Sequence, residues 1–298
     1  MNSSYSFWKI KNKKIMKEKL FPEITLYGFG YVGRAIFNFL KDKYQVQIVD
    51  PKPAGPLPEE IRKLIVTPGK QKPTVYAVVA VPTLPKKDGS CDTSLVESVI
   101  KNSEHKHYLI KSTVLPGTTE SLIKKTGKKI VFSPEFIGEG GYFIPHWKGY
   151  PHPTDMKLHE FHIFGGQRIE TKIWVSLWQK IAGWAPHYAQ TDSVTAEIIK
   201  YAENSHLATL KMFWDELYDL CKIEKRDYHE VRELLLLDGR ISRAMSLIYE
   251  NARGFGGKCL PKDLNAIVRH MEKHGSNPHF FKAILQSNKI FRGKNQKQ

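Results

Sequence analysis

The sequence predicts an α/β fold in which a doubly wound parallel sheet is followed by an all-helical domain with one long helix. Three observations support this prediction. Short β-rich runs alternate with helical patterns between residues 24 and 132, which is typical of parallel sheets covered by helices. A glycine-rich turn joins the first run to the first helical pattern. From Asp192 onward, apolar residues recur at helical spacing over a segment of about 30 residues.

The first part of the chain is predicted to contain strands and helices in turn. We expect strands at Ile24–Tyr27, Gln45–Val49, Val75–Val81, Tyr108–Lys111 and Ile130–Phe132, and helices at Val32–Lys41, Ser94–Asn102 and Thr118–Lys125. A strand at Phe161–Phe164, a helix at Glu170–Ile181 and a strand around His187 continue the pattern. Residues Tyr142–Glu160 lack periodicity, which indicates a long loop of the kind that is often functional or mobile.

The second part of the chain is predicted to be helical. Asp192 is a plausible N-cap for a helix that reaches Cys221, roughly 45 Å away at the usual rise. A helix of this length exceeds the needs of one small domain, so it also suits a subunit interface. Shorter helices are expected at Tyr228–Leu237, Ile241–Glu250, Lys262–Lys273 and His279–Lys289. We therefore predict a basic tail (1–22), a sheet domain (23–190), a helical domain (191–290) and a second basic tail (291–298).

Composition restricts the classes of function. The chain has 298 residues and a net charge of +16, which favours anionic partners. No recognition module for nucleic acid is visible, so we do not expect nucleic acid as a partner. No apolar run is long enough to span a membrane, and the basic first residues lack the apolar stretch of a signal peptide. Three cysteines without paired spacing indicate a reducing compartment, and we expect the cytoplasm.

A metal site is not expected. The Cys and His residues do not have the spacing of zinc ligands. One segment does contain a loose group of histidines, His146, His152, His159 and His162. Their spacing matches no helix or turn that would bring them together around an ion.

The glycine-rich turn predicts a dinucleotide site of the Rossmann type. Gly28, Gly30 and Gly33 follow a strand and open a helix, where they permit a tight turn and close approach of a pyrophosphate to the helix N-terminus. Asp50 ends the next strand, where a carboxylate can bind the ribose hydroxyls of NAD. Asp50 would repel the extra phosphate of NADP, although nearby Lys52 leaves that cofactor open.

Two further patterns allow a chemical and a structural interpretation. Cys259 lies in a glycine-rich loop beside lysines and a helix start, where its thiolate can be stabilised, but a cysteine buried in a tight turn fits equally well. Lys200 and Asn204 are four residues apart and share a helix face. They could hold an oxyanion, or they could belong to a solvated face.

Together these motifs resemble the UDP-glucose/GDP-mannose 6-dehydrogenases. The resemblance covers most of residues 24–290, and the matching stretches occur in the family's order. They are GFGYVG at 28–33, VPT at 81–83, DGSCDTS at 88–94, KSTVLPGTT at 111–119, SPEFIGEG at 133–140, AEIIKYAENSHLAT at 196–209 and GFGGKCLPKD at 254–263.

The resemblance implies a four-electron oxidation that consumes two NAD and converts the C6 alcohol of a nucleotide-linked sugar, a UDP-sugar by preference, to a carboxylate. Cys259 would be the nucleophile that carries a thioester, and covalent capture would retain the aldehyde between the two oxidations. Lys200 and Asn204 would stabilise oxyanions. Asp263 and Thr113 would position water, and Glu139 would be the acid/base.

Binding roles are also implied by the resemblance. The cofactor site would comprise Gly28, Gly30, Tyr31, Val32, Gly33, Asp50, Thr83 and Thr113. The substrate site would comprise Glu135, Phe136, Lys200, Asn204, Arg240, Phe255, Gly256 and Gly257. In the family, the arginine that matches Arg240 reaches the substrate of the neighbouring subunit, so a homodimer is expected.

The sequence also departs from the family's pattern. The segment between Asp50 and Val81 is short, Gly138 replaces a bulky or basic residue, and Lys258 precedes the cysteine. The chain ends soon after the helical domain, so we expect a short form without the family's C-terminal nucleotide-binding domain. Two alternatives remain: a dehydrogenase of a smaller sugar or hydroxy compound, and an inactive relative that still binds NAD.

Overall fold

The computed structural model describes residues 23–53, 55–137 and 155–294. Both predicted tails, except residues 291–294, and most of the predicted 142–160 loop lie outside the described residues. The strands form one eight-stranded sheet in the order β3-β2-β1-β4-β5-β6-β7-β8. They are β1 (Ile24–Tyr27), β2 (Val46–Val49), β3 (Ile65–Val66), β4 (Tyr76–Val79), β5 (His107–Ile110), β6 (Ile130–Phe132), β7 (Phe161–Gly165) and β8 (His187–Thr191). The predicted α/β class is confirmed.

The central strands are buried on both faces, which explains their nearly continuous apolar sequences. β1 pairs in parallel with β2 and β4, and β4 with β5. The sheet is not wholly parallel, because β7 meets β6 in an antiparallel pair between Phe132 and Gly165. Gly165 is needed there, since an added Cβ would lie 2.5 Å from the Cβ of Ala196. This close contact brings the start of the long helix against the sheet.

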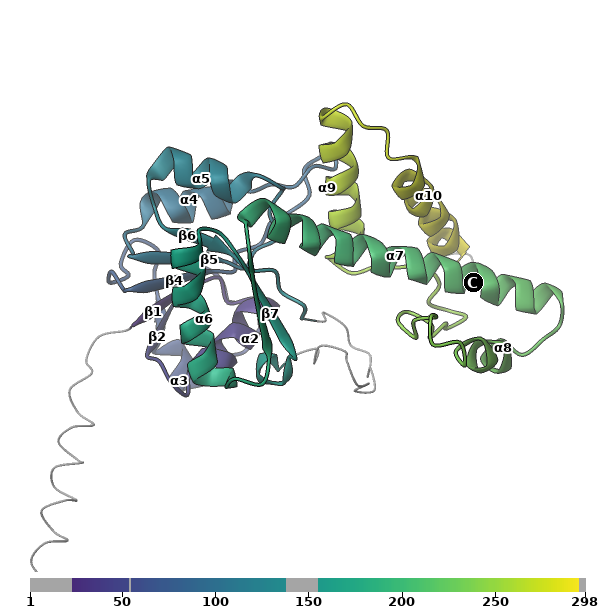
Figure 1. Ribbon diagram of the computed structural model, residues 1–298, viewed down its shortest axis with the longest axis horizontal. Coiled ribbons are helices and arrows are strands. Elements are labelled where there is room, and N and C mark those ends of the chain that lie inside the picture. The colour runs from purple at the N-terminus through teal and green to yellow at the C-terminus, as the bar shows by residue number, and fades with distance from the viewer. Residues whose placement is uncertain (1–22, 54, 138–154, 295–298) are drawn as a thin grey trace, which may run out of the picture.

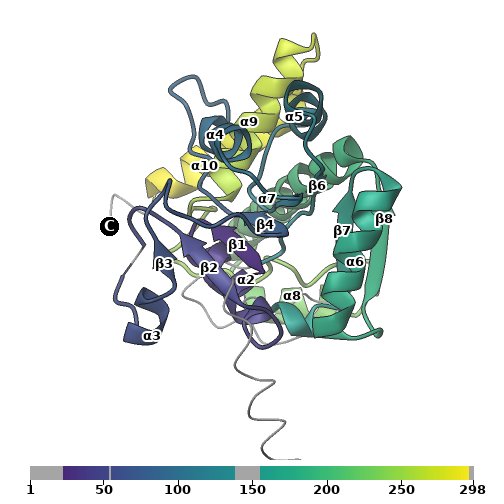
Figure 2. The same ribbon diagram turned by 90° about the vertical axis from the view of Figure 1, so that its left-hand side faces the viewer.

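Helices cover both faces of the sheet (Figures 1 and 2). They are α2 (Tyr31–Leu40), α3 (Glu59–Arg62), α4 (Ser94–Asn102), α5 (Thr118–Thr126) and α6 (Arg168–Ala182), with a 3-10 turn η1 at Met156–Leu158. Ile36 and Phe39 of α2 share one core with Trp174 and Trp178 of α6. Residues of α4 and α5 form a second core on the opposite face of the sheet. Two layers of helices thus enclose the sheet, as strand–helix alternation predicts.

One long helix, α7 (Ser193–Ile223), leads away from the sheet (Figure 1). Its N-cap is Asp192, whose carboxylate accepts a hydrogen bond of 2.8 Å from the Thr195 amide, as the sequence predicted. The helices α8 (Tyr228–Leu235), α9 (Leu260–Lys273) and α10 (His279–Lys294) pack along it. None of the helices in the described ranges is both long and apolar enough to cross a membrane. The proposed domain boundaries remain a prediction.

The helix predicted at Ile241–Glu250 is wrong. The segment forms turns, and Met245 adopts a left-handed conformation with φ of 60°. Its carbonyl groups bind side chains of neighbouring helices: Trp214 Nε1 donates to Ala244 O over 3.1 Å, and Tyr228 Oη donates to Ser246 O over 2.7 Å. Apolar residues at helical spacing therefore pack against α7 and α8 without forming a helix of their own.

Candidate active site

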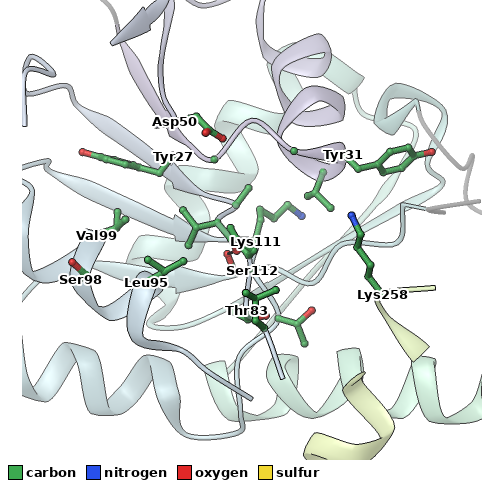
Figure 3. Close-up of a pocket in the computed structure, with 18 of the residues that line it drawn as sticks. Tyr27, Tyr31, Asp50, Thr83, Leu95, Ser98, Val99, Lys111, Ser112 and Lys258 are labelled. Carbon is green, nitrogen blue, oxygen red and sulfur yellow. Dashed lines mark hydrogen bonds between the residues drawn. The ribbon is translucent and has the colours of Figure 1, made fainter. Parts of the chain in front are cut away.

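A cavity of about 1190 Å³ opens at the carboxyl ends of the central strands (Figure 3). The glycine turn after β1 lines one side, and the segment after β4 and the segment after β5 line the base. The loop before α9 closes the other side with residues 257–259. Ligands of open parallel sheets bind at this edge, where adjacent connections diverge. Segments more than 200 residues apart in the sequence therefore meet around one cavity.

The glycine turn is shaped by close backbone contacts. Gly28 has φ of 90°, and an added Cβ would lie 2.5 Å from Ala80 O on the neighbouring strand. A Cβ on Gly33 would lie 2.1 Å from Gly28 O, so α2 can start close to the strand only with glycine there. Gly30 has open space around it and lines the cavity with Tyr31 and Val32. A ligand can therefore approach the N-terminus of α2 closely.

Asp50 lies at the end of β2 and lines the same cavity (Figure 3). Its Oδ2 accepts a hydrogen bond of 2.6 Å from the Phe29 amide, and its Oδ1 accepts one of 2.7 Å from the Lys52 amide. The carboxylate is thereby fixed beside the glycine turn. Each oxygen has a second lone pair, so Asp50 can still accept hydrogen bonds from ribose hydroxyls.

Cys259 is the N-cap residue of α9, is half-buried, and lines the cavity. Thr113 and Thr83 line it as well, and Lys262 Nζ donates to Thr83 Oγ1 over 3.3 Å. Helix N-termini and neighbouring lysines stabilise thiolates. The structure therefore places Cys259 at the N-terminus of a helix, in the same cavity as the glycine turn.

Asp263 and Asn204 lie behind this part of the wall. Asp263 is one turn after Cys259 and fully buried, and its Oδ2 accepts a hydrogen bond of 2.5 Å from Asn204 Nδ2. Lys262 Nζ lies 2.6 Å from Asp263 Oδ1 in an ion pair without the geometry of a hydrogen bond. The structure thus brings the predicted amide and carboxylate together next to the cysteine.

Lys200 is buried on α7 between two carboxylates. Its Nζ donates to Glu203 Oε2 and to Glu135 O, both over 2.7 Å, and lies 3.5 Å from Glu135 Oε1. Burial disfavours the charged ammonium, but Glu135 and Glu203 outweigh that effect and raise the pKa of Lys200. The same burial raises the pKa of Glu203. Lys200 is therefore held as a cation behind the cavity wall, where Glu135 is the lining residue.

Lys111 is a site residue that the sequence interpretation missed. It follows β5, is buried, and lines the cavity, where its Nζ donates to Ser133 Oγ and Pro134 O over 3.0 Å each. Burial lowers the pKa of Lys111 to about 7. The charge of Lys200 adds to this lowering, and the charge of Glu135 opposes it. A lysine directly after a mostly apolar strand was the available signal, since the carboxyl end of a buried parallel strand lies at the ligand edge.

Some predicted site residues do not line the cavity. The side chain of Arg240 is 89% exposed and pairs with Asp238 over 2.6 Å. Phe136 packs on Phe161, and its ring centroid lies 5.6 Å from Lys200 Nζ. Phe255 is buried in the helical core, and of the loop glycines Gly257 lines the cavity whereas Gly256 does not. Glu139 lies outside the described residues.

Metal ligands are not gathered in the part of the chain that the structure describes. No group of three or more His, Cys, Asp or Glu side chains there could hold an ion. His159 and His162 stack with ring centroids 6.0 Å apart, and burial lowers the pKa of His162 to about 3. His146 and His152 lie outside the described residues.

Comparison with known proteins gives consistent matches. Residues 194–290 match the model of the UDP-glucose/GDP-mannose dehydrogenase family, central domain. The chain is 32% identical to a UDP-glucose 6-dehydrogenase of Rickettsia felis over 226 residues, which cover 72% of this chain and 47% of that protein. It is 30% identical to a UDP-glucose 6-dehydrogenase of Haloferax volcanii over 234 residues, which cover 70% and 51%. The chain spans about half the length of these curated relatives.

Solved structures also match along most of the chain. A UDP-glucose dehydrogenase of Pyrobaculum islandicum aligns with a TM-score of 0.73 and 25% identity, covering 92% of this chain and 69% of that one. A UDP-D-ManNAc dehydrogenase of Pyrococcus horikoshii aligns with a TM-score of 0.69 and 20% identity, covering 90% and 68%. The second similarity concerns the fold alone.

Proposed function

Because the chain belongs to the UDP-glucose/GDP-mannose dehydrogenase family, we propose that it oxidises the C6 alcohol of a nucleotide-linked sugar to a carboxylate with NAD. One observation carries the proposal: Cys259 and the glycine turn line the same cavity. A cofactor on the turn and a substrate attached to the cysteine would therefore share one space. An inactive NAD-binding relative would have no need for this arrangement.

The residues around the cavity fit a dinucleotide. Gly30, Tyr31 and Val32 would present the N-terminus of α2 to the pyrophosphate, and Asp50 would bind the adenosine ribose. Thr83 and Thr113 would lie against the nicotinamide half. These residues would hold two NAD molecules in succession, and each would supply the hydride acceptor for one of the two oxidations.

Cys259 would divide the oxidation into two stages. After the alcohol carbon has lost its first hydride and the hydroxyl its proton, the thiolate adds to the resulting aldehyde and forms a thiohemiacetal. Loss of a second hydride and a proton gives the thioester, and water releases the carboxylic acid and the thiol. Lys200 and Asn204 would stabilise the oxyanion of these intermediates, and Asp263 would orient water together with Thr113. The partners of Asn204 and Lys200 support a preorganised site.

The charge of the cavity favours a nucleotide sugar over a free sugar. Two carboxylates, Asp50 and Glu135, line the cavity. The lining lysines are Lys52, Lys86, Lys87, Lys258 and Lys262, together with Lys111, whose pKa is lowered to about 7 by burial. Such an excess of cations suits two bound diphosphate groups, one from the cofactor and one from the substrate. A UDP-sugar is the substrate that we favour.

A screen for NADH formation tests the activity. The protein is incubated with NAD and, separately, with UDP-glucose, GDP-mannose, dTDP-glucose or free glucose, and products are identified by mass. We expect two NADH for each nucleotide-linked carboxylate formed. Oxidation of free glucose alone would instead support the smaller-substrate alternative.

The variant Cys259→Ala tests the nucleophile. We expect acid formation to stop while NAD still binds, because the thiol is required for the thioester but not for the glycine turn. Cys221→Ala is the matched control, since Cys221 is buried in the helical core away from the cavity. Acid formation by Cys259→Ala at the wild-type rate would remove Cys259 from the mechanism.

We also propose a homodimer formed through α7. Phe213, Leu220 and Ile223 on this helix are each at least half exposed. Arg240 is exposed as well. A residue that acts in the partner's site would be exposed in the single chain. Light scattering at working concentration should give twice the mass of the 34.3 kDa chain. A monomer would contradict the shared site.

A further inference from the structure

The loop that leads to Cys259 is held by hydrogen bonds to its backbone at Gly254 and Phe255. Asn288 on α10 binds Phe255 twice: the Phe255 amide donates to Asn288 Oδ1 over 2.7 Å, and Asn288 Nδ2 donates to Phe255 O over 3.0 Å. Asn288 is buried. Its side-chain amide thus pairs with Phe255 as a neighbouring strand would, and it fixes both the position and the orientation of that peptide.

Asp215 on α7 holds the preceding residues. Its Oδ2 accepts hydrogen bonds of 2.9 Å from the Gly254 amide and from Lys211 Nζ, and its Oδ1 accepts one of 2.7 Å from Arg253 Nε. Asp215 is fully buried. The Arg253 guanidinium lies over the Tyr218 ring, 4.6 Å from its centroid. The start of the loop is therefore locked to α7 by buried charge-assisted contacts.

The loop also lies too close to α10 for side chains to intervene. Gly254 has φ of 74°, and a Cβ there would lie 2.7 Å from Asn288 Oδ1. Phe255 itself packs in a core with Ala208 and Met212 of α7. Residues 253–255 are thus enclosed between the two helices.

The same helix α7 also carries the groups that would stabilise the oxyanions. Asn204 binds Asp263, so both ends of the segment Gly254–Asp263 are fastened to α7 and Cys259 lies between them. We propose that Asn288 and Asp215 are positioning residues that set the place of Cys259 relative to Lys200 and Asn204. The proposal rests on the proposed function, in which Cys259 is the nucleophile. Misplacement of a reacting group by about 1 Å can cost about 10²-fold in rate.

The variant Asn288→Ala tests this proposal, with Gln286→Ala as the matched control because Gln286 is an exposed amide on the same helix. Three quantities are measured: kcat and KM with the nucleotide sugar that wild type oxidises, the Kd for NAD, and the pH dependence of iodoacetamide modification at Cys259, followed by peptide mass. We expect kcat to fall by about 10²-fold, with the Kd for NAD within twofold of wild type. We expect the alkylation profile to shift to higher pH, because the thiolate loses its alignment with the start of α9 and its lysines.

Two results together would overturn the proposal: a kcat within about twofold of wild type, and an alkylation profile within about 0.2 pH units of wild type, which is on the order of experimental error. If Asn288→Ala does not fold, Asn288→Asp is used, since it keeps the volume and the acceptor for the Phe255 amide and replaces the donor with a carboxylate oxygen, which repels Phe255 O. Alkylation requires no sugar substrate. If wild type oxidises no nucleotide sugar, the proposed function fails, whereas the alkylation comparison still decides whether Asn288 positions Cys259.

Discussion

The two sides of the cavity are built in different ways. On the glycine-turn side, shape comes from the backbone: Gly28 and Gly33 lie where a Cβ would collide with neighbouring peptide groups. On the Cys259 side, it comes from buried charge, with Lys200 held by two carboxylates and Asn204 bound to Asp263. On the first side, therefore, few residues can replace the glycines, whereas the identity of the other side chains matters less. The second depends on individual charged groups, and truncating one of them should change chemistry more than binding.

The largest expected effect is on the charged side. Lys200→Ala should lower turnover by roughly 10²–10³ if the ammonium is an oxyanion donor, while NAD binding remains near wild type. Stopped-flow kinetics and NAD titration measure the two quantities. Lys222→Ala is the control on the same helix, since Lys222 pairs with Glu250 at the surface. A loss of less than tenfold would make Lys200 a structural residue and would break the distinction between the two sides.

A smaller effect is expected on the glycine-turn side. Asp50→Ala should weaken NAD binding by about tenfold, which is the loss of one good hydrogen-bonded contact, and should weaken NADP binding much less. The reason is that the carboxylate favours ribose hydroxyls and repels a phosphate. Titration of wild type and variant with both cofactors measures the change in preference. A wild-type protein that already prefers NADP would contradict the role of Asp50.

The glycine-turn side was predictable because its information is local. The turn, the helix start and Asp50 lie within 23 residues, from Gly28 to Asp50. The hydrophobic periodicity of that segment predicts the helix after the turn and the strand that ends at Asp50. Most predicted strands match the structure to within one or two residues, since burial on both faces imposes nearly continuous apolar runs. The long helix matches as closely because its apolar residues recur at helical spacing. The error at Ile241–Glu250 has a physical cause: carbonyl groups there bind Trp214 and Tyr228, contacts that periodicity does not reveal.

The charged side could not be derived from local pattern. Motif resemblance named Cys259, Lys200 and Asn204, but the partners that hold them come from distant segments. Asn288 follows Phe255 by 33 residues, and Asp215 precedes Gly254 by 39. Neither lies in a matching stretch. Both lie on helices, where the sequence alone does not distinguish a buried polar residue from an exposed one. Lys111 lies in a matching stretch, yet its burial and its altered pKa depend on the packing of β5, β6 and α7 around it.

Lys111 and Lys200 provide the last comparison, between two buried lysines with opposite shifts in pKa. Lys200 is held by two carboxylates and its pKa is raised, whereas Lys111 binds a hydroxyl and a carbonyl and its pKa is lowered to about 7. The charged groups around Lys111 are Glu135 and Lys200, and Lys111 in turn lowers the pKa of His162. Lys111 is thus the buried lysine whose charge should change near neutral pH.

This titration predicts a pH-dependent stability. In the unfolded chain a lysine has a pKa of about 10.4, so between pH 7 and that value the unfolded state binds more protons at Lys111 than the folded state does. The cost of burying the ammonium is therefore present in full below pH 7 and is relieved as the pH rises. From pH 7 to pH 8, the free energy of unfolding of wild type should rise by about 1 kcal/mol more than that of Lys111→Met.

Urea unfolding at the two pH values measures this difference. The exposed Lys63→Met is the control and should keep the wild-type pH dependence, because Lys63 has a side chain that is 71% exposed. Equal pH dependence in wild type and Lys111→Met would show that Lys111 stays charged, as Lys200 does, and that the two lysines do not differ.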